Sequence, residues 1–231
     1  MSVGNQMGIG YTAVKSDGEF FTERWHDNDK FFDRATVRSA AIEEELKKYK
    51  QYLSTHTNID QNYSLFGSPD MNDIRTVTMH TRYATCGREF ANTHPFVDGD
   101  TSLVHNGVIS NALRMGLNKI STCDSEAALQ SYINLNVGKE INNAQAWIDT
   151  LEGYWAFGVL SRDTDNNRIL DIIRNDAWLY YSEVKGLGTV MATTEDIIRT
   201  SANMLGLEYS KPKVIKDNKL FRFNAVTGEL S

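Results

Sequence analysis

Residues 80–126 constrain the fold of this chain more than any other stretch, because they place strand-like segments and a helix start close together. The segment from His80 to Thr85 ends an apolar-alternating run that includes Ile74, Val77 and Met79. Alternation with a period of two predicts a strand with one buried face. The run then meets a glycine, Gly87, where the strand is expected to end.

A second apolar run, residues 102–109, is interrupted in its middle by His105, Asn106 and Gly107. An Asn-Gly pair between apolar segments predicts a turn, because both residues tolerate positive φ. The same pair could present an amide side chain beside a bare backbone N–H, which is the arrangement an oxyanion hole needs. The residues leave both interpretations open.

Asp124 and Ser125, followed by an apolar run, predict a helix start at which one of the two is the N-cap and the carboxylate lies near the positive helix end. With Arg82 and the Asn106–Gly107 pair, this carboxylate would suit a small zwitterion. Arginine binds an α-carboxylate, aspartate an α-ammonium group, and the amide pair a reacting carbonyl. Taken singly, each feature is explained more simply by an ion pair, a helix cap or a turn.

The order and spacing of the motifs HTRYATCG, NTHPF, LVHNGVISN and DSE resemble the glutaminase domain of the class II glutamine amidotransferases, which are N-terminal-nucleophile hydrolases. The resemblance extends over nearly the whole chain and implies a single domain over residues 1–231. It also implies an α+β fold, a four-layer αββα sandwich of two mainly antiparallel sheets. Many strands with helices before, between and after them separately suggest two packed sheets covered by helices.

The resemblance also implies a role for each motif residue. Arg82 would bind the glutamine α-carboxylate with the assistance of Thr85, and Asp124 would hold the α-ammonium group. Asn106 and the Gly107 N–H would form the oxyanion hole for the tetrahedral intermediate. No cofactor or metal is implied.

The nucleophile is where the chain departs from the family pattern. The family uses a cysteine at the mature N-terminus, whose own α-amine is the base, so His80 and His105 are interpreted as scaffold. No cysteine lies in the N-terminal region here, and the segment GIGYTAVKSDGEF matches the second family strand better than the first. The other alignment places Met7 at the cysteine position, where a thioether cannot attack.

Three replacements for the nucleophile are considered. Ser2 would be an N-terminal hydroxyl if Met1 were removed. Cys86 or Cys123 could be a relocated thiolate, or the two could form a redox or metal pair, although small buried thiols often only fill space. Alternatively, another polypeptide supplies the strand and this chain is the larger piece of a split enzyme.

The predicted function is therefore recognition of L-glutamine, with hydrolysis of its side-chain amide to glutamate and ammonia where a nucleophile is present. Lacking the usual nucleophile, the chain would be an inactive homologue or part of a split enzyme, and an ammonia-using synthetase would act in trans. The alternative is a non-catalytic structural or glutamine-sensing module that reuses the scaffold.

Composition and net charge argue against nucleic-acid and membrane partners. The formal net charge of −6 does not favour binding to nucleic acid or to an anionic membrane. The sequence contains no apolar run of membrane-spanning length and no signal-like N-terminus. With only two cysteines, this predicts a cytoplasmic protein, in a cell or in the host cell of a virus.

Periodicity and turn signals also predict the individual elements. The predicted helices are residues 36–53, 124–135, 142–151 and 194–205, with a loop at 55–73. The predicted strands outside the central stretch are residues 8–15, 19–25, 153–161, 168–174, 178–182, 188–193, 219–224 and 226–230.

Overall fold

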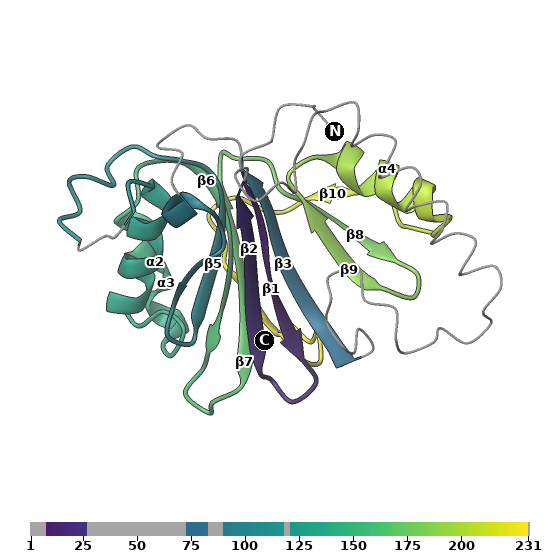
Figure 1. Cartoon of the computed structure of the whole chain (residues 1–231), viewed down its shortest axis with the longest axis horizontal. Helices are drawn as coiled ribbons and strands as arrows, with labels where there is room; N and C mark the ends of the chain where they lie inside the picture. Colours follow the sequence, from purple (N-terminus) through teal and green to yellow (C-terminus); the bar gives the residue numbers. More distant parts are fainter. Residues whose placement is uncertain (1–7, 27–72, 83–89, 118–120, 231) are drawn as a thin grey trace.

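A computed structural model describes residues 8–26, 73–82, 90–117 and 121–230. The predicted helix at 36–53, nearly all of the loop at 55–73, and Ser2, Met7, Thr85 and Cys86 lie outside the described residues. The described part is a mixed α+β structure in which all the named strands pair antiparallel (Figure 1). No helix in these ranges is long and apolar enough to cross a membrane.

The first sheet has the order β2-β1-β3. Its strands are β1 (Gly8–Lys15), β2 (Phe20–His26) and β3 (Ile74–Arg82). The predicted N-terminal hairpin is confirmed, and the Gly18 N–H donates to the Lys15 carbonyl to close its turn. Because β1 is paired on both sides, it is the central strand among these three.

The second sheet has the order β11-β7-β6-β5-β4. Its strands are β4 (Phe96–Asp98), β5 (Thr101–Ile109), β6 (Gly153–Arg162), β7 (Arg168–Asn175) and β11 (Phe221–Asn224). The strand predicted at 226–230 is wrong: Gly228 closes a turn onto the Asn224 carbonyl, and only an isolated bridge joins Leu230 to Phe223. The C-terminal segment therefore adds little to the sheet.

A third sheet, in the order β10-β8-β9, corrects the expectation of two. Its strands are β8 (Tyr180–Val184), β9 (Gly188–Ala192) and β10 (Lys213–Val214). Asp176, at φ 55°, interrupts the extended chain after β7, so β8 starts a separate sheet. The predicted helix that follows is confirmed as α4 (Glu195–Leu205), with Thr194 as N-cap accepting from the Ile197 N–H.

The first and second sheets, β2-β1-β3 and β11-β7-β6-β5-β4, pack face to face, and helices cover the other side of the five-stranded sheet (Figure 1). The Thr12 and Ser102 hydroxyls, one from each sheet, are 2.6 Å apart and buried. The covering helices are α2 (Asp124–Asn134) and α3 (Ala144–Asp149). The short 3-10 turn η4 (Ile141–Asn143) directly precedes α3, and another, η3 (Phe90–Asn92), precedes β4. Leu103, Leu129, Trp147 and Phe157 fill the space beneath these helices with at most 1% of their surface exposed.

The apolar alternation in β3 faces away from the five-stranded sheet. Thr78 pairs with Thr12, whose hydroxyl reaches Ser102, so even-numbered residues of β3 point inward. The apolar residues Val77 and Met79 point the other way and are 47% and 54% exposed. The pattern thus predicted the strand correctly, and its polar face is the one that packs between the sheets.

A buried ion pair holds the helical layer to the far edge of the five-stranded sheet. Arg222 donates through Nε and Nη2 to the two oxygens of Asp171 at 2.8 and 2.7 Å. The Tyr132 hydroxyl of α2 donates to the same carboxylate at 2.7 Å, and Asp171 has no exposed surface. Strands β7 and β11 and helix α2 therefore share one acceptor.

Asp171→Ala is expected to cost about 3–5 kcal/mol of unfolding free energy, because it leaves the Arg222 guanidinium buried without its carboxylate. Urea titration measures this cost. The matched control is Glu208→Ala, which removes an exposed ion pair with Lys185 and should cost less than about 1 kcal/mol. Equal losses in the two variants would contradict this interpretation.

Candidate functional site

The three predicted motif segments meet through buried polar side chains. The His80 ring, near the end of β3, lies close to the backbone of His105 in β5. The His105 ring then reaches α2, with Nδ1 2.9 Å from the Ser125 hydroxyl. The segments that carry Arg82, Asn106 and Asp124 are thereby joined in one network.

Asn106 and Gly107 do not form the predicted turn. Both lie within β5, opposite Ala156 and Trp155 of β6. Gly107 has φ 137°, and a Cβ there would overlap the Tyr154 carbonyl oxygen. The glycine is thus needed for a close approach between strands, and Asn106 is left exposed on the strand beside it.

The predicted N-cap at Asp124 or Ser125 is also wrong. Cys123 is the N-cap, so Asp124 is the first helical residue. The Cys123 side chain makes no cap hydrogen bond. Its Oδ2 accepts from the Ile109 N–H at 2.7 Å, which ties the helix start to the end of β5. Glu126 supports the loop before the helix by accepting from the Ser121 N–H at 2.7 Å.

Arg82 occupies the last position of β3 and is 2% exposed. It lies on the inward face of the strand, two residues beyond His80, and is paired in register with Gly8 of β1. Its positive charge contributes to lowering the pKa of His80 and of His94. The guanidinium therefore lies near the histidine network at the end of β3.

His94 is a member of this network that the sequence alone did not identify. Its Nε2 is 2.9 Å from the Ser125 hydroxyl, and its ring centroid is 4.0 Å from that of His80. The available signal was a histidine within the NTHPF motif, to which no role was assigned. Ser125 thus contacts two histidines from separate segments.

Burial keeps all three imidazoles neutral. It lowers the pKa of His80 to about 3, with the charges of His105 and Arg82 adding to the effect. It lowers the pKa of His105 to about 4, against an opposing effect of the Asp124 carboxylate. Burial also lowers the pKa of His94 well below its usual range. Neutral, buried rings suit a scaffold better than proton transfer at neutral pH.

Cys123 lies in the core, with 4% of its surface exposed, in the same apolar cluster as Ala127 and Ala128. Its Sγ is 3.4 Å from the Ser125 hydroxyl and 3.5 Å from Asp124 Oδ1. This placement favours the space-filling interpretation over a thiolate that reaches substrate. Within the described ranges, no group of three or more histidine, cysteine or carboxylate side chains could hold a metal ion.

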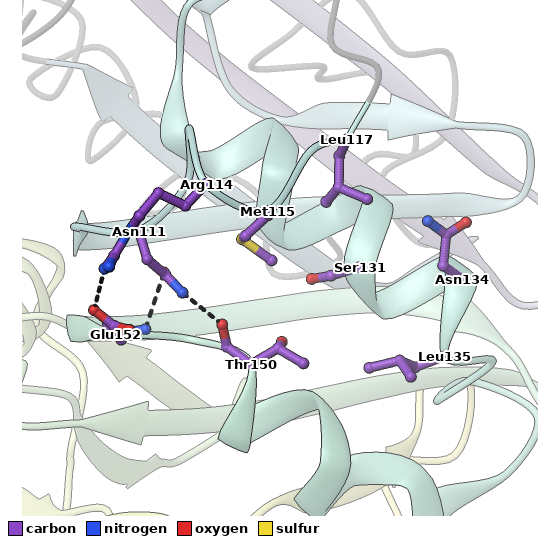
Figure 2. A pocket seen from close by; sticks show the side chains of 9 residues that line it. All are labelled: Asn111, Arg114, Met115, Leu117, Ser131, Asn134, Leu135, Thr150 and Glu152. Carbon is purple, nitrogen blue, oxygen red and sulfur yellow. Dashed lines mark hydrogen bonds and ion pairs between the residues drawn. The ribbon is translucent and has the colours of Figure 1, made fainter.

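A hollow of about 440 Å³ lies elsewhere, beside the later turns of α2 (Figure 2). Its lining residues are Asn111, Arg114, Met115, Leu117, Ser131, Asn134, Leu135, Thr150 and Glu152. Several of their polar groups bond to one another, including the Arg114–Glu152 ion pair at 2.5 Å. None of the predicted site residues lines this hollow.

Comparison with known proteins finds a curated relative with a similar sequence. A glutamine–fructose-6-phosphate aminotransferase (isomerizing) from Caldanaerobacter subterraneus subsp. tengcongensis is 29% identical in an alignment 154 residues long, which covers 61% of this chain and 24% of that protein. The chain thus spans about a quarter of the length of this curated relative. No protein-family model matches the chain.

Solved structures share the fold. The glutamine phosphoribosylpyrophosphate amidotransferase from B. subtilis, in complex with ADP and GMP, superposes with a TM-score of 0.61 at 16% identity, over 96% of this chain and 42% of that one. A structure described as the allosteric regulatory enzyme of purine biosynthesis gives a TM-score of 0.62 at 14% identity, over the same shares. Sequence and fold together confirm the predicted resemblance: the chain is homologous to class II glutamine amidotransferase domains of the N-terminal-nucleophile type.

Stability is expected to fall as the pH drops below about 6.5, because the unfolded state binds protons on His80, His94 and His105 that the folded state excludes. Each ring contributes a slope of up to about 1.4 kcal/mol per pH unit between the unfolded pKa and the lower folded pKa. Urea titrations at about pH 7.5 and about pH 5.5 measure the difference. His94→Gln should flatten the slope, and equal stability at the two pH values would contradict the expectation.

Gly107→Ala is expected to destabilise the fold by at least about 3 kcal/mol, because the added methyl group meets the β6 backbone, with Trp155 Cα 2.7 Å away. Thermal or urea unfolding gives the value. Gly99→Ala is the matched control: its φ of 54° is also positive, but nothing lies within 4 Å of a Cβ there. That variant should lose only about 1 kcal/mol, and a similar loss at Gly107 would argue against the close approach.

Proposed function

We propose that this chain recognises L-glutamine through Arg82, Asp124 and the Asn106–Gly107 pair. The observation that carries the proposal is the buried network that joins the three segments on which these groups lie. Three independent structural features would have no reason to share one set of polar contacts. A site for one small zwitterion requires them to be held together.

Each group has a role that its chemistry supports. The Arg82 guanidinium binds the α-carboxylate, with Thr85 assisting. Asp124 holds the α-ammonium group through Oδ1, because Oδ2 already accepts from Ile109. Asn106, which is exposed on β5, and the Gly107 N–H stabilise the oxyanion that forms on the side-chain carbonyl.

The reaction we propose for this site is hydrolysis of the glutamine side-chain amide to glutamate and ammonia. A nucleophile attacks the carbonyl, the oxyanion hole holds the tetrahedral intermediate, and ammonia leaves. Water then releases glutamate from the acyl intermediate. The ammonia would be used by a synthetase that acts in trans, and the site requires neither a cofactor nor a metal.

We further propose that another polypeptide supplies the strand that carries the nucleophile. Among the described strands, β1 is paired on both sides, so an added strand joins this sheet at the edge of β2 or of β3. The edge of β3 ends at Arg82, which favours it. Pairing along an open strand edge provides main-chain hydrogen bonds without any new core.

The complete αββα sandwich remains part of the proposal. The helical layer and two face-to-face sheets supply three layers. The outer face of the sheet β2-β1-β3 carries the exposed apolar side chains Val77 and Met79. We propose that a further helical layer covers this face, which would complete the four layers.

A second candidate function is a non-catalytic glutamine sensor or structural module. The burial of Cys123 favours it, because this cysteine is removed from the surface that a substrate would reach. A sensor would retain Arg82 and Asp124 as ligand-binding groups and would release no glutamate. A purely structural module would bind no glutamine.

The first experiment is calorimetric titration of the purified chain with L-glutamine, with glutamate release assayed on the same sample. Arg82→Ala should weaken binding by at least about thirtyfold, because it removes a charge-assisted contact. Asp124→Asn should weaken it about tenfold and keeps an acceptor for the Ile109 N–H. Arg114→Ala, which removes an exposed ion pair beside the other hollow, is the matched control and should bind normally.

The outcomes separate the candidates. Binding with turnover would assign the nucleophile to this chain, and substitutions of Ser2, Cys86 and Cys123 would identify it. Binding without turnover would support the sensor or the split enzyme, which adding the partner strand would then distinguish. Absence of binding would remove the glutamine proposal, as would unchanged affinity in both the Arg82 and the Asp124 variants.

A further inference from the structure

We infer that Ser125 is a positioning residue that fixes the Asn106–Gly107 segment of β5 in place from the first turn of α2. Ser125 is 1% exposed and therefore acts within the core rather than on a ligand. Its effect on glutamine binding rests on the function proposed above. Its effect on the position of β5 does not, and the two can be tested separately.

The first turn of α2 holds β5 at two points. On one side of the Asn106–Gly107 pair, the Ser125 hydroxyl is 2.9 Å from His105 Nδ1. On the other side, Asp124 Oδ2 is 2.7 Å from the Ile109 nitrogen. Neighbouring residues of one helix turn thus bracket the segment that carries the oxyanion groups, so its position follows from that of the helix.

The hydroxyl also connects this bracket to a second segment. Ser125 Oγ is 2.9 Å from His94 Nε2, and the His94 ring lies 4.0 Å from that of His80 on β3. The His80 ring in turn lies close to the backbone of His105. The contacts form a closed circuit through β3, β5, the segment before β4 and α2, in which Ser125 is the only member from the helix.

Bonding at both rings imposes a specific proton arrangement. A hydroxyl has one hydrogen, so it donates to at most one of the two ring nitrogens and accepts an N–H from any other, and Cys123 Sγ, 3.4 Å away, is a third partner. At least one of His94 Nε2 and His105 Nδ1 therefore carries a proton. Removing the hydroxyl would leave both nitrogens buried without their partner, and β5 would lose one of its two attachments to the helix.

The chain offers a closely matched control in Ser131. It lies on the same helix, is 5% exposed, and its hydroxyl accepts from the Trp147 indole N–H at 3.0 Å. It also donates to the Ala128 carbonyl at 2.9 Å. Ser131→Ala therefore removes a buried hydroxyl from α2 while leaving the bracket on β5 intact.

The test is nitrogen-15 NMR on the full chain, followed by glutamine titration. In the wild-type spectrum at neutral pH, at least one of His94 Nε2 and His105 Nδ1 should be protonated, and two unprotonated nitrogens would overturn the inference without any variant. Ser125→Ala should shift the backbone amide signals of Asn106 and Gly107, whereas Ser131→Ala should leave both in place. Equal spectra of this segment in the two variants would refute the positioning role.

Titration then measures the consequence for binding. Ser125→Ala should weaken glutamine affinity about tenfold relative to Ser131→Ala, and Ser125→Thr, which keeps a hydroxyl, should restore most of it. Unchanged affinity in Ser125→Ala would refute the link to the site. If the wild-type chain binds no glutamine, the proposed function fails, and the ring protonation and amide signals still decide whether Ser125 positions β5.

Discussion

The polar contacts around Ser125 are the constraint on which the site depends. Segments that are distant in the sequence contact one another through this hydroxyl. The charged and amide groups expected to meet a ligand lie within two residues of the network. Buried polar atoms are costly unless they are bonded, so the network allows few alternative arrangements of β3, β5 and α2. The groups are held by the core and not by flexible loops.

Buried and hydrogen-bonded polar groups also hold the framework around the site. The Asp171–Arg222 pair ties β7 and β11 to Tyr132 of α2, while the other end of that helix contacts β5 through Asp124. At the start of β7, three residues before Asp171, Arg168 donates to the Gly18 and Asp100 carbonyls. Arginines with carboxylate and carbonyl acceptors thus hold this part of the sheet packing, and those bonds offset the cost of burying their charge.

Homology identifies the type of domain but leaves the ligand and the reaction to experiment. The chain covers about a quarter of its curated relative, so the relative's full activity does not transfer to it. Arg82, Asn106, Gly107 and Asp124 lie on described elements, whereas Cys123 lies in the core. Fold alone hosts many functions, and the site must decide between them.

Local sequence signals determined much of this protein. The N-terminal hairpin, the Thr194 cap of α4, the alternation of β3 and the family motifs all depend on residues within a few positions of one another. Such short-range patterns survive into the structure when no distant contact opposes them.

Only the tertiary structure decided the remaining features. The Asn106–Gly107 pair became strand because β6 pairs with it, and Cys123 became the N-cap because Asp124 is bound to Ile109. The contacts of Ser125 with His105 and His94 join residues 20 and 31 positions apart, beyond the reach of any local pattern. Periodicity and turn propensities describe what a segment prefers by itself, whereas pairing and buried hydrogen bonds decide which preference survives.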